Sequence, residues 1–302
     1  MAKARIAVIG AGLMGHGIAQ VFALAGHVVT ITDAHKPNLD SAKERITRNL
    51  DDLGDDPRAV ERVTAVADLA ACVRDADYVV EAILEDMPLK QRTFAEIEQH
   101  VRPDAILASN TSVMPITEIM QGLKHRERAL GTHWWNPPFL VPLVEVIGTR
   151  WTSQAAIDFT MKLHADAGKT PAHVKKDVPG FIGNRLQHAL WREAISLVER
   201  GICDAATVDS VVKAAFGRRI AVLGPLENAD LVGTDLTLAI HKTVLPDIEH
   251  RPGPSPYLER LVAEGKLGFK SGEGFRKWSP EQQAALRAKV VQHLKKARES
   301  DA

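Results

Sequence analysis

The sequence predicts an α/β fold in which a doubly wound parallel sheet is followed by an all-helical domain. Apolar runs of strand composition alternate with helical patterns from residue 5 to about residue 175, which is typical of a parallel sheet with helices on both faces. Strand patterns vanish after Pro179-Gly180, and long helical patterns fill the remainder. A chain of 302 residues is long enough for about two domains. We place them at 1–178 and 179–302.

The first strand enters a glycine-rich turn. An apolar run, Ile6–Ile9, is followed by the G-x-G-x-x-G pattern of Gly10–Gly15 and then by a helical run from residue 17 to 25. Gly10 permits the tight turn, Gly12 has no side chain to hold a pyrophosphate away, and Gly15 lets helix and strand pack closely. The N–H groups and positive dipole end of the helix favour phosphates. The alternative is a merely structural glycine turn.

An acidic residue completes the pattern. The second strand, at 28–32, ends on Asp33, a little over twenty residues after the first glycine. At that distance a carboxylate can accept hydrogen bonds from an adenosine ribose. We therefore predict a Rossmann-type domain that binds NAD. The carboxylate would repel the 2′-phosphate of NADP, and we expect His35 and Lys36 to point to solvent.

The other elements follow from hydrophobic spacing and from turn residues. In the first domain we expect strands at 78–82, 105–108, 129–135, 143–147 and 172–175, and helices at 39–53, 57–63, 69–74, 87–100, 116–120 and 153–167. In the second domain we expect helices at 182–200, 205–216, 228–246 and 256–264. Their apolar faces either form an interface between subunits or only pack on each other.

The last segment predicts a capped terminal helix. Ser279 as N-cap, Pro280 at the first helical position and Gln282 at the third form a capping box. Apolar residues spaced four apart, Leu286, Val290 and Leu294, indicate an amphipathic helix. We expect it to dock on the protein body or on a partner subunit, with membrane binding as the alternative.

Composition excludes several classes of function. The 38 basic and 38 acidic side chains cancel, which gives no electrostatic reason to expect nucleic acid or an anionic membrane as a partner. No apolar run approaches the roughly 20 residues that span a bilayer. Because residues 1–5 lead directly into the first strand, we expect no signal peptide. Cys72 and Cys203 lie far apart and form no metal-type cluster, as in reduced cytoplasmic proteins.

A histidine and a glutamate form the second candidate site. His133 and Glu145 lie in two expected strands, at symmetric distances from the loop that joins them. If these strands pair, the imidazole and the carboxylate can meet. A carboxylate bonded to one ring nitrogen fixes the tautomer and stabilises the imidazolium, which leaves the other nitrogen to act as a base. The alternative is a structural histidine.

At this point the sequence resembles a known family. Eight motifs that recur in this order in L-3-hydroxyacyl-CoA dehydrogenases are Gly10–Gly15, Val80–Ile83, Ser109–Ser112, His133–Pro137, Pro142–Val146, Pro179–Arg185, Gly224-Pro225 and Gly272–Phe275. The resemblance covers residues 5 to about 278. It implies NAD-dependent oxidation of an L-3-hydroxyacyl-CoA to the 3-oxoacyl-CoA, an activity of fatty acid metabolism, by a homodimer formed mainly through the helical domain.

The resemblance also implies roles for single residues. His133 would take the proton of the 3-hydroxyl, and Glu145 would orient and stabilise its ring. Ser112 and Asn184 would hydrogen-bond the reacting oxygen or position the histidine, and Asn136 would lie close to the same centre. The implied cofactor-binding residues are Gly10, Gly12, Leu13, Met14, Gly15, Asp33, Ala82, Glu85, Lys90 and Asn110. For Lys90 the alternative is a solvated helix lysine.

Two segments depart from the acyl-CoA enzymes. A lysine-rich stretch that serves the phosphates of coenzyme A in those enzymes is replaced here by residues 47–56, with four aspartates. Residues 218–225, Arg-Arg-Ile-Ala-Val-Leu-Gly-Pro, look more like relatives that act on free acids, such as L-gulonate 3-dehydrogenase, L-carnitine dehydrogenase and a dehydrogenase of pyridoxine breakdown. Arg219 would suit a substrate carboxylate, and an ion pair with a protein carboxylate such as Glu227 or Asp230 is the alternative.

These departures leave three functions open. The first is the acyl-CoA activity, the second is the same chemistry on a free small 3-hydroxy acid, and the third is a catalytically silent NAD-binding protein similar to a lens crystallin. The presence of the complete catalytic set argues against the third.

Overall fold

The computed structural model describes residues 3–301, so Met1, Ala2 and Ala302 lie outside it. The chain forms two compact units. The first runs up to Arg185 and takes in the C-terminal stretch from Gln292, and the second comprises Leu186–Val291. This division differs from the expected boundary at 178/179 because residues 182–184 hydrogen-bond to the first unit, as described below.

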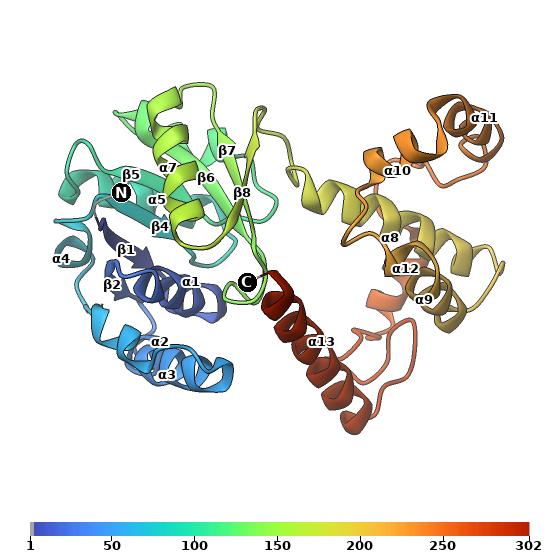
Figure 1. The fold of residues 1–302 in the computed structure, drawn as a ribbon, viewed down its shortest axis with the longest axis horizontal. Helices are drawn as coiled ribbons and strands as arrows, with labels where there is room; N and C mark the ends of the chain where they lie inside the picture. The colour runs from blue at the N-terminus through green and yellow to red at the C-terminus, as the bar shows by residue number, and fades with distance from the viewer. Residues whose placement is uncertain (1–2, 302) are drawn as a thin grey trace. The chain divides into compact units, whose positions relative to one another are not determined.

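The first unit is built on an eight-stranded sheet in the order β3-β2-β1-β4-β5-β6-β7-β8 (Figure 1). Its strands are β1 (Arg5–Ile9), β2 (Val28–Thr32), β3 (Val63–Ala65), β4 (Tyr78–Glu81), β5 (Ile106–Ser109), β6 (Ala129–Trp134), β7 (Leu143–Gly148) and β8 (Thr170–Val174). The short edge strand β3 was not predicted.

All neighbouring strands pair in parallel except β6 and β7, which are antiparallel. The expectation of a wholly parallel sheet is therefore wrong at this pair. The loop of residues 135–142 that joins the two strands is shorter than a crossover connection, which needs a dozen or more residues. The sheet is thus mixed, and the two strands face each other directly.

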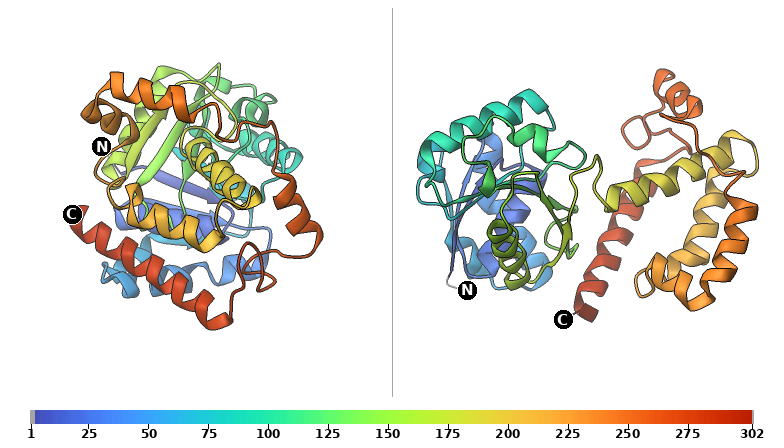
Figure 2. Two further views of the ribbon diagram at one scale, coloured as in Figure 1. Left: turned by 90° about the vertical axis from the view of Figure 1, so that its right-hand side faces the viewer. Right: turned by 90° about the horizontal axis from the view of Figure 1, so that it is seen from above.

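Helices cover both faces of the sheet (Figure 2). They are α1 (Leu13–Leu24), α2 (Lys36–Asp40), α3 (Ala42–Leu53), α4 (Leu69–Val73), α5 (Met87–His100), α6 (Ile116–Met120) and α7 (Gln154–Asp166), with 3-10 turns η1 (Pro57–Arg62) and η2 (Arg126–Arg128). The first helix begins earlier than expected because it starts directly at the glycine turn. The expected helix at 39–53 is two helices, and that at 57–63 is the 3-10 turn.

Each sheet face has its own apolar core. Successive side chains of a strand point to opposite faces, so Ile6 and Val8 of β1 join the core under α1, α3 and α7. Ala7 and Ile9 join the core under α4, α5 and α6. Burial on both faces explains the nearly continuous apolar runs by which these strands were recognised.

The second unit is helical. It contains α8 (Gly183–Glu199) from Leu186 onward, α9 (Ala205–Ala214), η3 (Phe216–Arg218), α10 (Pro225–Val232), α11 (Thr234–Val244), α12 (Pro256–Ala263) and the start of α13 (Pro280–Asp301). The single helix expected at 228–246 is wrong. The chain breaks at Gly233, whose φ of +99° lies outside the helical region and favours glycine.

The terminal helix α13 has the predicted capping box. The Gln282 N–H donates to Ser279 Oγ at 3.2 Å, and the Ser279 N–H donates to Gln282 Oε1 at 3.0 Å. The far end of the helix belongs to the first unit, where a charged side chain holds it. Arg298 donates two hydrogen bonds to the Asp55 carboxylate, at 2.7 and 3.0 Å, while Val290 is half exposed. In the described residues no helix combines the length and apolar character needed to cross a membrane.

Candidate active site

The glycine turn has the geometry that its residues predict. Gly10 has φ +102°, and a Cβ there would lie 2.6 Å from Ala82 O. A Cβ on Gly15 would lie 1.7 Å from Gly10 O, so helix and strand touch at this point. A Cβ on Gly12 would meet nothing within 4 Å. Of these three glycines, Gly12 alone faces open space. A phosphate group can therefore approach the backbone at Gly12.

The start of α1 is suited to an anion. Gly12 is its N-cap, without a side-chain cap, and no acidic residue lies in the first turn. The first N–H groups of this twelve-residue helix are thus left for a ligand, and Leu13 beside them is 66% exposed. The turn lies at the C-terminal end of β1, between β2 and β4, where strand order reverses, which is the usual ligand crevice of such sheets. These residues fit a dinucleotide pyrophosphate.

Asp33 points toward this turn. Its Oδ2 accepts a hydrogen bond from the Ala11 N–H at 2.7 Å, and its Oδ1 accepts one from the His35 N–H at 2.7 Å. The side chains of His35 and Lys36 are exposed, as expected, and Lys36 pairs with Asp40. The carboxylate therefore lies beside the glycine turn without a cationic side chain from these two neighbours.

A buried ion pair lies behind the turn. Lys90 is fully buried, and its Nζ lies 2.6 Å from Glu81 Oε1 and 3.4 Å from Glu85 Oε2. Glu81 also accepts a hydrogen bond from Ser109 Oγ at 2.7 Å. Lys90 is therefore not a solvated lysine, and two protein carboxylates satisfy its ammonium group.

Glu85 extends this network to the predicted substrate side. It accepts hydrogen bonds from the Thr111 hydroxyl and from the Ser112 N–H, the latter at 2.9 Å. Burial opposes its charged form, yet these bonds and the charge of Lys90 hold the pKa of Glu85 below its usual value. The segment 109–112 is thus fixed by carboxylates at both ends. Nearby, Asn110 Oδ1 accepts from the Trp134 N–H at 2.9 Å.

His133 and Glu145 form the predicted pair. They lie directly opposite each other in the β6–β7 ladder, and His133 Nδ1 is 2.8 Å from Glu145 Oε2. Both side chains are buried. Among the described residues, no hydrogen-bond partner is found for His133 Nε2. The carboxylate therefore holds one ring nitrogen and leaves the other for a ligand.

Backbone N–H groups at the start of α8 bind the other oxygen of Glu145. Glu145 Oε1 accepts hydrogen bonds from the N–H groups of Ile182 and Gly183, at 2.8 and 3.0 Å. Burial disfavours its charge, but His133 and these N–H groups hold the pKa of Glu145 below its usual value. Glu145 therefore remains a carboxylate at neutral pH.

The same turn brings two further predicted residues together. Asn184 Nδ2 donates to the Ser112 backbone oxygen at 2.8 Å. His133, Glu145, Asn184 and Ser112 therefore belong to one connected network within the first unit. The Ser112 side chain is exposed at the edge of this network.

Other predicted residues lie outside this network. Asn136 is exposed in the loop after β6, on a cis peptide bond to Pro137. Arg219 is an exposed residue of the second unit. Trp134, which follows His133 in β6, is buried in the core against Phe22.

Sequence reasoning missed the residues that support the site from behind. Glu81 and Ser109 appeared only as letters within motifs, and Arg45, which contacts the glycine turn, was not singled out at all. One sequence feature could have indicated them: Glu81 ends the apolar strand β4. A charged residue buried in a sheet is rare unless it has a partner.

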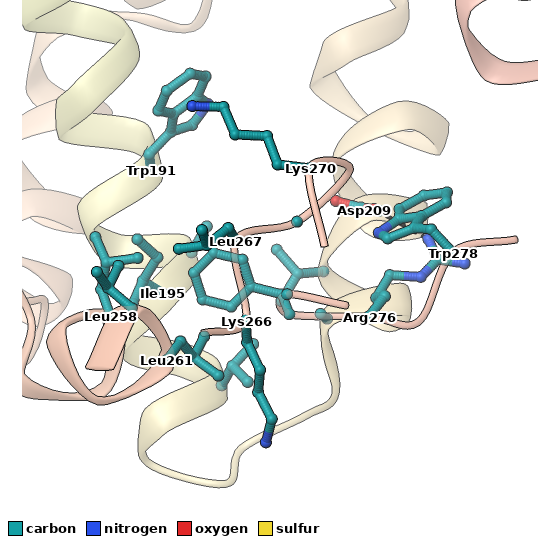
Figure 3. A pocket seen from close by; sticks show the side chains of 18 residues that line it. Trp191, Ile195, Asp209, Leu258, Leu261, Lys266, Leu267, Lys270, Arg276 and Trp278 are labelled. Carbon is teal, nitrogen blue, oxygen red and sulfur yellow. Dashed lines mark hydrogen bonds and ion pairs between the residues drawn. The ribbon is translucent and has the colours of Figure 1, made fainter. Parts of the chain in front are cut away.

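The second unit has a groove of about 620 Å³ (Figure 3). The side chains of Ile195, Leu258, Leu261 and Leu267 meet in it, and Lys266 points away from it. None of the predicted site residues lines this groove. In the described part of the chain, no three His, Cys, Asp or Glu side chains are grouped so that they could hold a metal ion.

A Rossmann-type unit with a phosphate-binding glycine turn is typical of NAD-dependent enzymes, and comparison with known proteins identifies the family. Residues 5–178 match the family described as 3-hydroxyacyl-CoA dehydrogenase, NAD binding domain. Residues 180–278 match its C-terminal domain. The chain belongs to the 3-hydroxyacyl-CoA dehydrogenase family.

Individual relatives differ in their substrates. The chain is 36% identical to 5-formyl-3-hydroxy-2-methylpyridine 4-carboxylate 5-dehydrogenase of Mesorhizobium japonicum, over 96% of this chain and 95% of that protein. It is 37% identical to the mitochondrial hydroxyacyl-coenzyme A dehydrogenase of Homo sapiens, over 90% of each chain.

The similar solved structures also include both a pyridine carboxylic acid dehydrogenase and a 3-hydroxybutyryl-CoA dehydrogenase. A crystal structure of a 5-dehydrogenase for that pyridine carboxylic acid superposes with a TM-score of 0.92 at 33% identity, covering 99% of this chain and 98% of the other. The 3-hydroxybutyryl-CoA dehydrogenase of Escherichia coli gives a TM-score of 0.76 at 32% identity, covering 92% of this chain and 60% of the other.

Proposed function

We propose that His133 and Glu145 form the catalytic acid–base pair of this dehydrogenase. The glycine turn would hold NAD, which would supply the hydride acceptor for the carbon that carries the substrate hydroxyl. His133 Nε2 takes the hydroxyl proton, because Nδ1 is engaged by Glu145. The buried carboxylate stabilises the imidazolium that forms, which favours proton transfer in this direction. The 2.8 Å contact between these two buried side chains carries the proposal.

Asn184 and Ser112 position the substrate oxygen and the histidine. The Asn184 amide is held by the Ser112 backbone oxygen, and the Ser112 N–H is held by Glu85. Hydrogen bonds that fix these groups before the substrate arrives reduce the reorganisation needed during reaction. The exposed Ser112 hydroxyl is left as a donor to the reacting oxygen, and Asn136 lies in the loop that follows His133.

For the substrate we propose a small hydroxylated compound with a free carboxylate. The high TM-score to a pyridine carboxylic acid dehydrogenase, over nearly the whole of both chains, favours this class. The acidic stretch 47–56 disfavours the polyanionic coenzyme A, because like charges repel. Arg219 is proposed to bind the carboxylate. Among the described residues, no carboxylate lies within 4.0 Å of its guanidinium, and Glu227 instead accepts a hydrogen bond from the Gly224 N–H at 2.7 Å.

An acyl-CoA substrate is the second candidate. The human and Deinococcus radiodurans relatives, each 37% identical, are named for hydroxyacyl- or hydroxybutyryl-coenzyme A. The same His133 chemistry serves both substrate classes. The choice between them therefore depends on the groups that bind the distal part of the substrate.

Formation of NADH, measured by absorbance, distinguishes the two classes. We expect greater kcat/KM for the free acids in a panel of 3-hydroxybutyryl-CoA, 3-hydroxybutyrate, L-gulonate, L-carnitine and the pyridine carboxylate named above. Arg219→Met should raise KM for the accepted acid at little change in kcat. Efficient turnover of 3-hydroxybutyryl-CoA by both proteins would reject the free-acid proposal and support the second candidate.

We also propose a homodimer formed through the second unit. Val222, Leu226 and Leu231 are each more than 70% exposed there, and among its described residues only Ser196 and Leu261 are buried. A helical unit with so little buried core gains stability by covering apolar surface with a second copy. A cytoplasmic location is proposed because Cys72 and Cys203 are both free thiols.

A further inference from the structure

An arginine from α3 reaches the inner side of the glycine turn. Arg45 Nη2 donates a hydrogen bond to the Ala11 carbonyl oxygen at 2.6 Å, and Nη1 donates to the Gly12 carbonyl oxygen at 3.4 Å. Nη2 also donates to the Asn38 carbonyl oxygen at 2.7 Å. The fork of this guanidinium therefore joins the turn to the segment that follows β2.

The charge of Arg45 is not used in an ion pair. Among the described residues, no carboxylate lies within the 4.0 Å of an ion pair with it, and its hydrogen bonds go to backbone oxygens. The charge of Asp33 acts on Arg45 from beyond that distance. The Asp33 carboxylate itself accepts a hydrogen bond from the Ala11 N–H at 2.7 Å. Ala11 is thus held at both its N–H and its carbonyl group, by an acidic and a basic side chain respectively.

These bonds act on the N–H groups that face the phosphate side. The Ala11 and Gly12 carbonyls belong to the peptide groups whose N–H bonds are those of Gly12 and Leu13, at the start of α1. A cationic donor on a carbonyl oxygen fixes the plane of that peptide group and polarises its N–H bond. A charge-assisted bond of this kind is roughly twice as strong as a neutral one.

His16 closes the arrangement from α1. Its Nδ1 lies 2.7 Å from the Gly12 oxygen and 3.1 Å from Arg45 Nη1. The ring is buried, and burial lowers the pKa of His16 below its ordinary value. It is therefore neutral at pH 7 and leaves Arg45 as the cation at this point.

We propose that Arg45 is a positioning residue for the dinucleotide: it holds the glycine turn in its binding geometry and adds positive potential behind the pyrophosphate. This inference rests on the NAD-binding unit alone and does not depend on which side chains perform catalysis. Loss of Arg45 should weaken cofactor binding and leave the chemical step intact. A lysine should restore only part of the affinity, because a single ammonium lacks the planar fork that serves both sides of the turn.

The test measures binding without turnover. We would compare wild type, Arg45→Met and Arg45→Lys by the Kd of ADP-ribose from calorimetry and of NADH from fluorescence, with melting temperature as a check on folding. Arg48→Met is the matched control, since Arg48 lies on the same helix but is exposed and pairs with Glu44 at 2.8 Å. Arg45→Met should raise both Kd values about tenfold or more. Arg45→Lys should be intermediate, and Arg48→Met should stay within about twofold.

Kinetics provide the second readout. KM for NAD should rise in Arg45→Met while kcat at saturating NAD stays close to wild type. A lowered melting temperature with an unchanged Kd for ADP-ribose would mean that Arg45 only stabilises the fold, and that result would overturn the proposal. A fall in kcat without a change in KM would overturn it as well. If Arg45→Met does not fold, the Kd measured for Arg45→Lys decides the question.

Discussion

In the proposed mechanism, one buried contact between His133 and Glu145 governs the proton transfer. Without Glu145, His133 Nδ1 would lose its hydrogen-bond partner. Without His133, Glu145 Oε2 would lose its partner, while Oε1 would keep the N–H groups of residues 182 and 183. Replacing either one therefore affects both stability and the developing positive charge on the ring.

We predict that His133→Ala reduces kcat by about a hundredfold to ten-thousandfold, as expected for loss of a general base. NAD should still bind, because the glycine turn is untouched. Glu145→Gln should lose nearly as much activity, since an amide does not stabilise an imidazolium. NADH fluorescence titration supplies the binding control. A variant that retained more than about a third of the wild-type rate would exclude the pair from catalysis.

A second histidine makes stability depend on pH. His164 is fully buried among Phe22, Tyr78 and Trp134, and burial lowers its pKa to about 4 although its Nδ1 hydrogen-bonds the Thr160 oxygen. The folded-state pKa lies below the unfolded value of 6.5, so the unfolded chain binds more protons between these values. The stability contributed by neutral His164 is complete above pH 6.5 and is lost as the pH falls toward 4.

We therefore predict that His164→Phe removes part of the acid sensitivity. The wild-type free energy of unfolding should lose about 3 kcal/mol more than that of the variant between pH 6.5 and 4, measured by urea titration. The exposed His125 offers a control, because His125→Gln should follow the wild type. Parallel curves for wild type and His164→Phe would contradict this prediction.

At the scale of elements, local patterns predicted the strands and helices that carry the glycine turn and the His133–Glu145 pair. Symmetric spacing about a short loop sufficed for that pair, since a short connection forces neighbouring strands to run antiparallel. Lys90 could not be placed in this way. Its burial depends on carboxylates from the end of β4 and the loop after it, which local spacing does not report.

The contact of Arg45 with the glycine turn could not be predicted from sequence spacing either. Sequence spacing places Arg45 on a mixed charged helix, and only the packing of α3 beside α1 brings its guanidinium to the turn. The break at Gly233 was missed because the apolar pattern continues across it, although the backbone there leaves the helical region. Tertiary packing and positive φ angles thus account for these failures.

For the end of α13 we predict a measurable coupling between Arg298 and Asp55. Arg298→Gln, Asp55→Asn and the double variant form a double-mutant cycle, read from the free energy of unfolding. The pair is partly exposed and bidentate, so a coupling of about 1 kcal/mol is expected. Lys296→Gln on the exposed side of the same helix serves as the control. Additive effects of the two substitutions would show that the ion pair contributes nothing.

At the scale of the whole molecule, we predict a dimer in solution. Size-exclusion chromatography with light scattering at micromolar concentration should give twice the 33.0 kDa mass of the chain. Substituting Leu226 and Leu231 by lysine should produce monomers, because charges at apolar contacts are costly to bury. Leu84→Lys in the first unit, at a residue that is 76% exposed, should stay dimeric. A monomeric wild type would refute the proposed assembly.

The ion pair between Asp55 and Arg298 also bears on the order of folding. Its residues are 243 positions apart, and the whole second unit is encoded between the two segments that form the first. During synthesis the strands of the sheet leave the ribosome before α13 does, so the ion pair of Asp55 forms only after α13 has been made. The ion pair then closes a loop that contains the whole second unit. The entropic cost of closing a loop grows only slowly with its length. The first unit thus depends on two segments of the chain, one made before the second unit and one made after it.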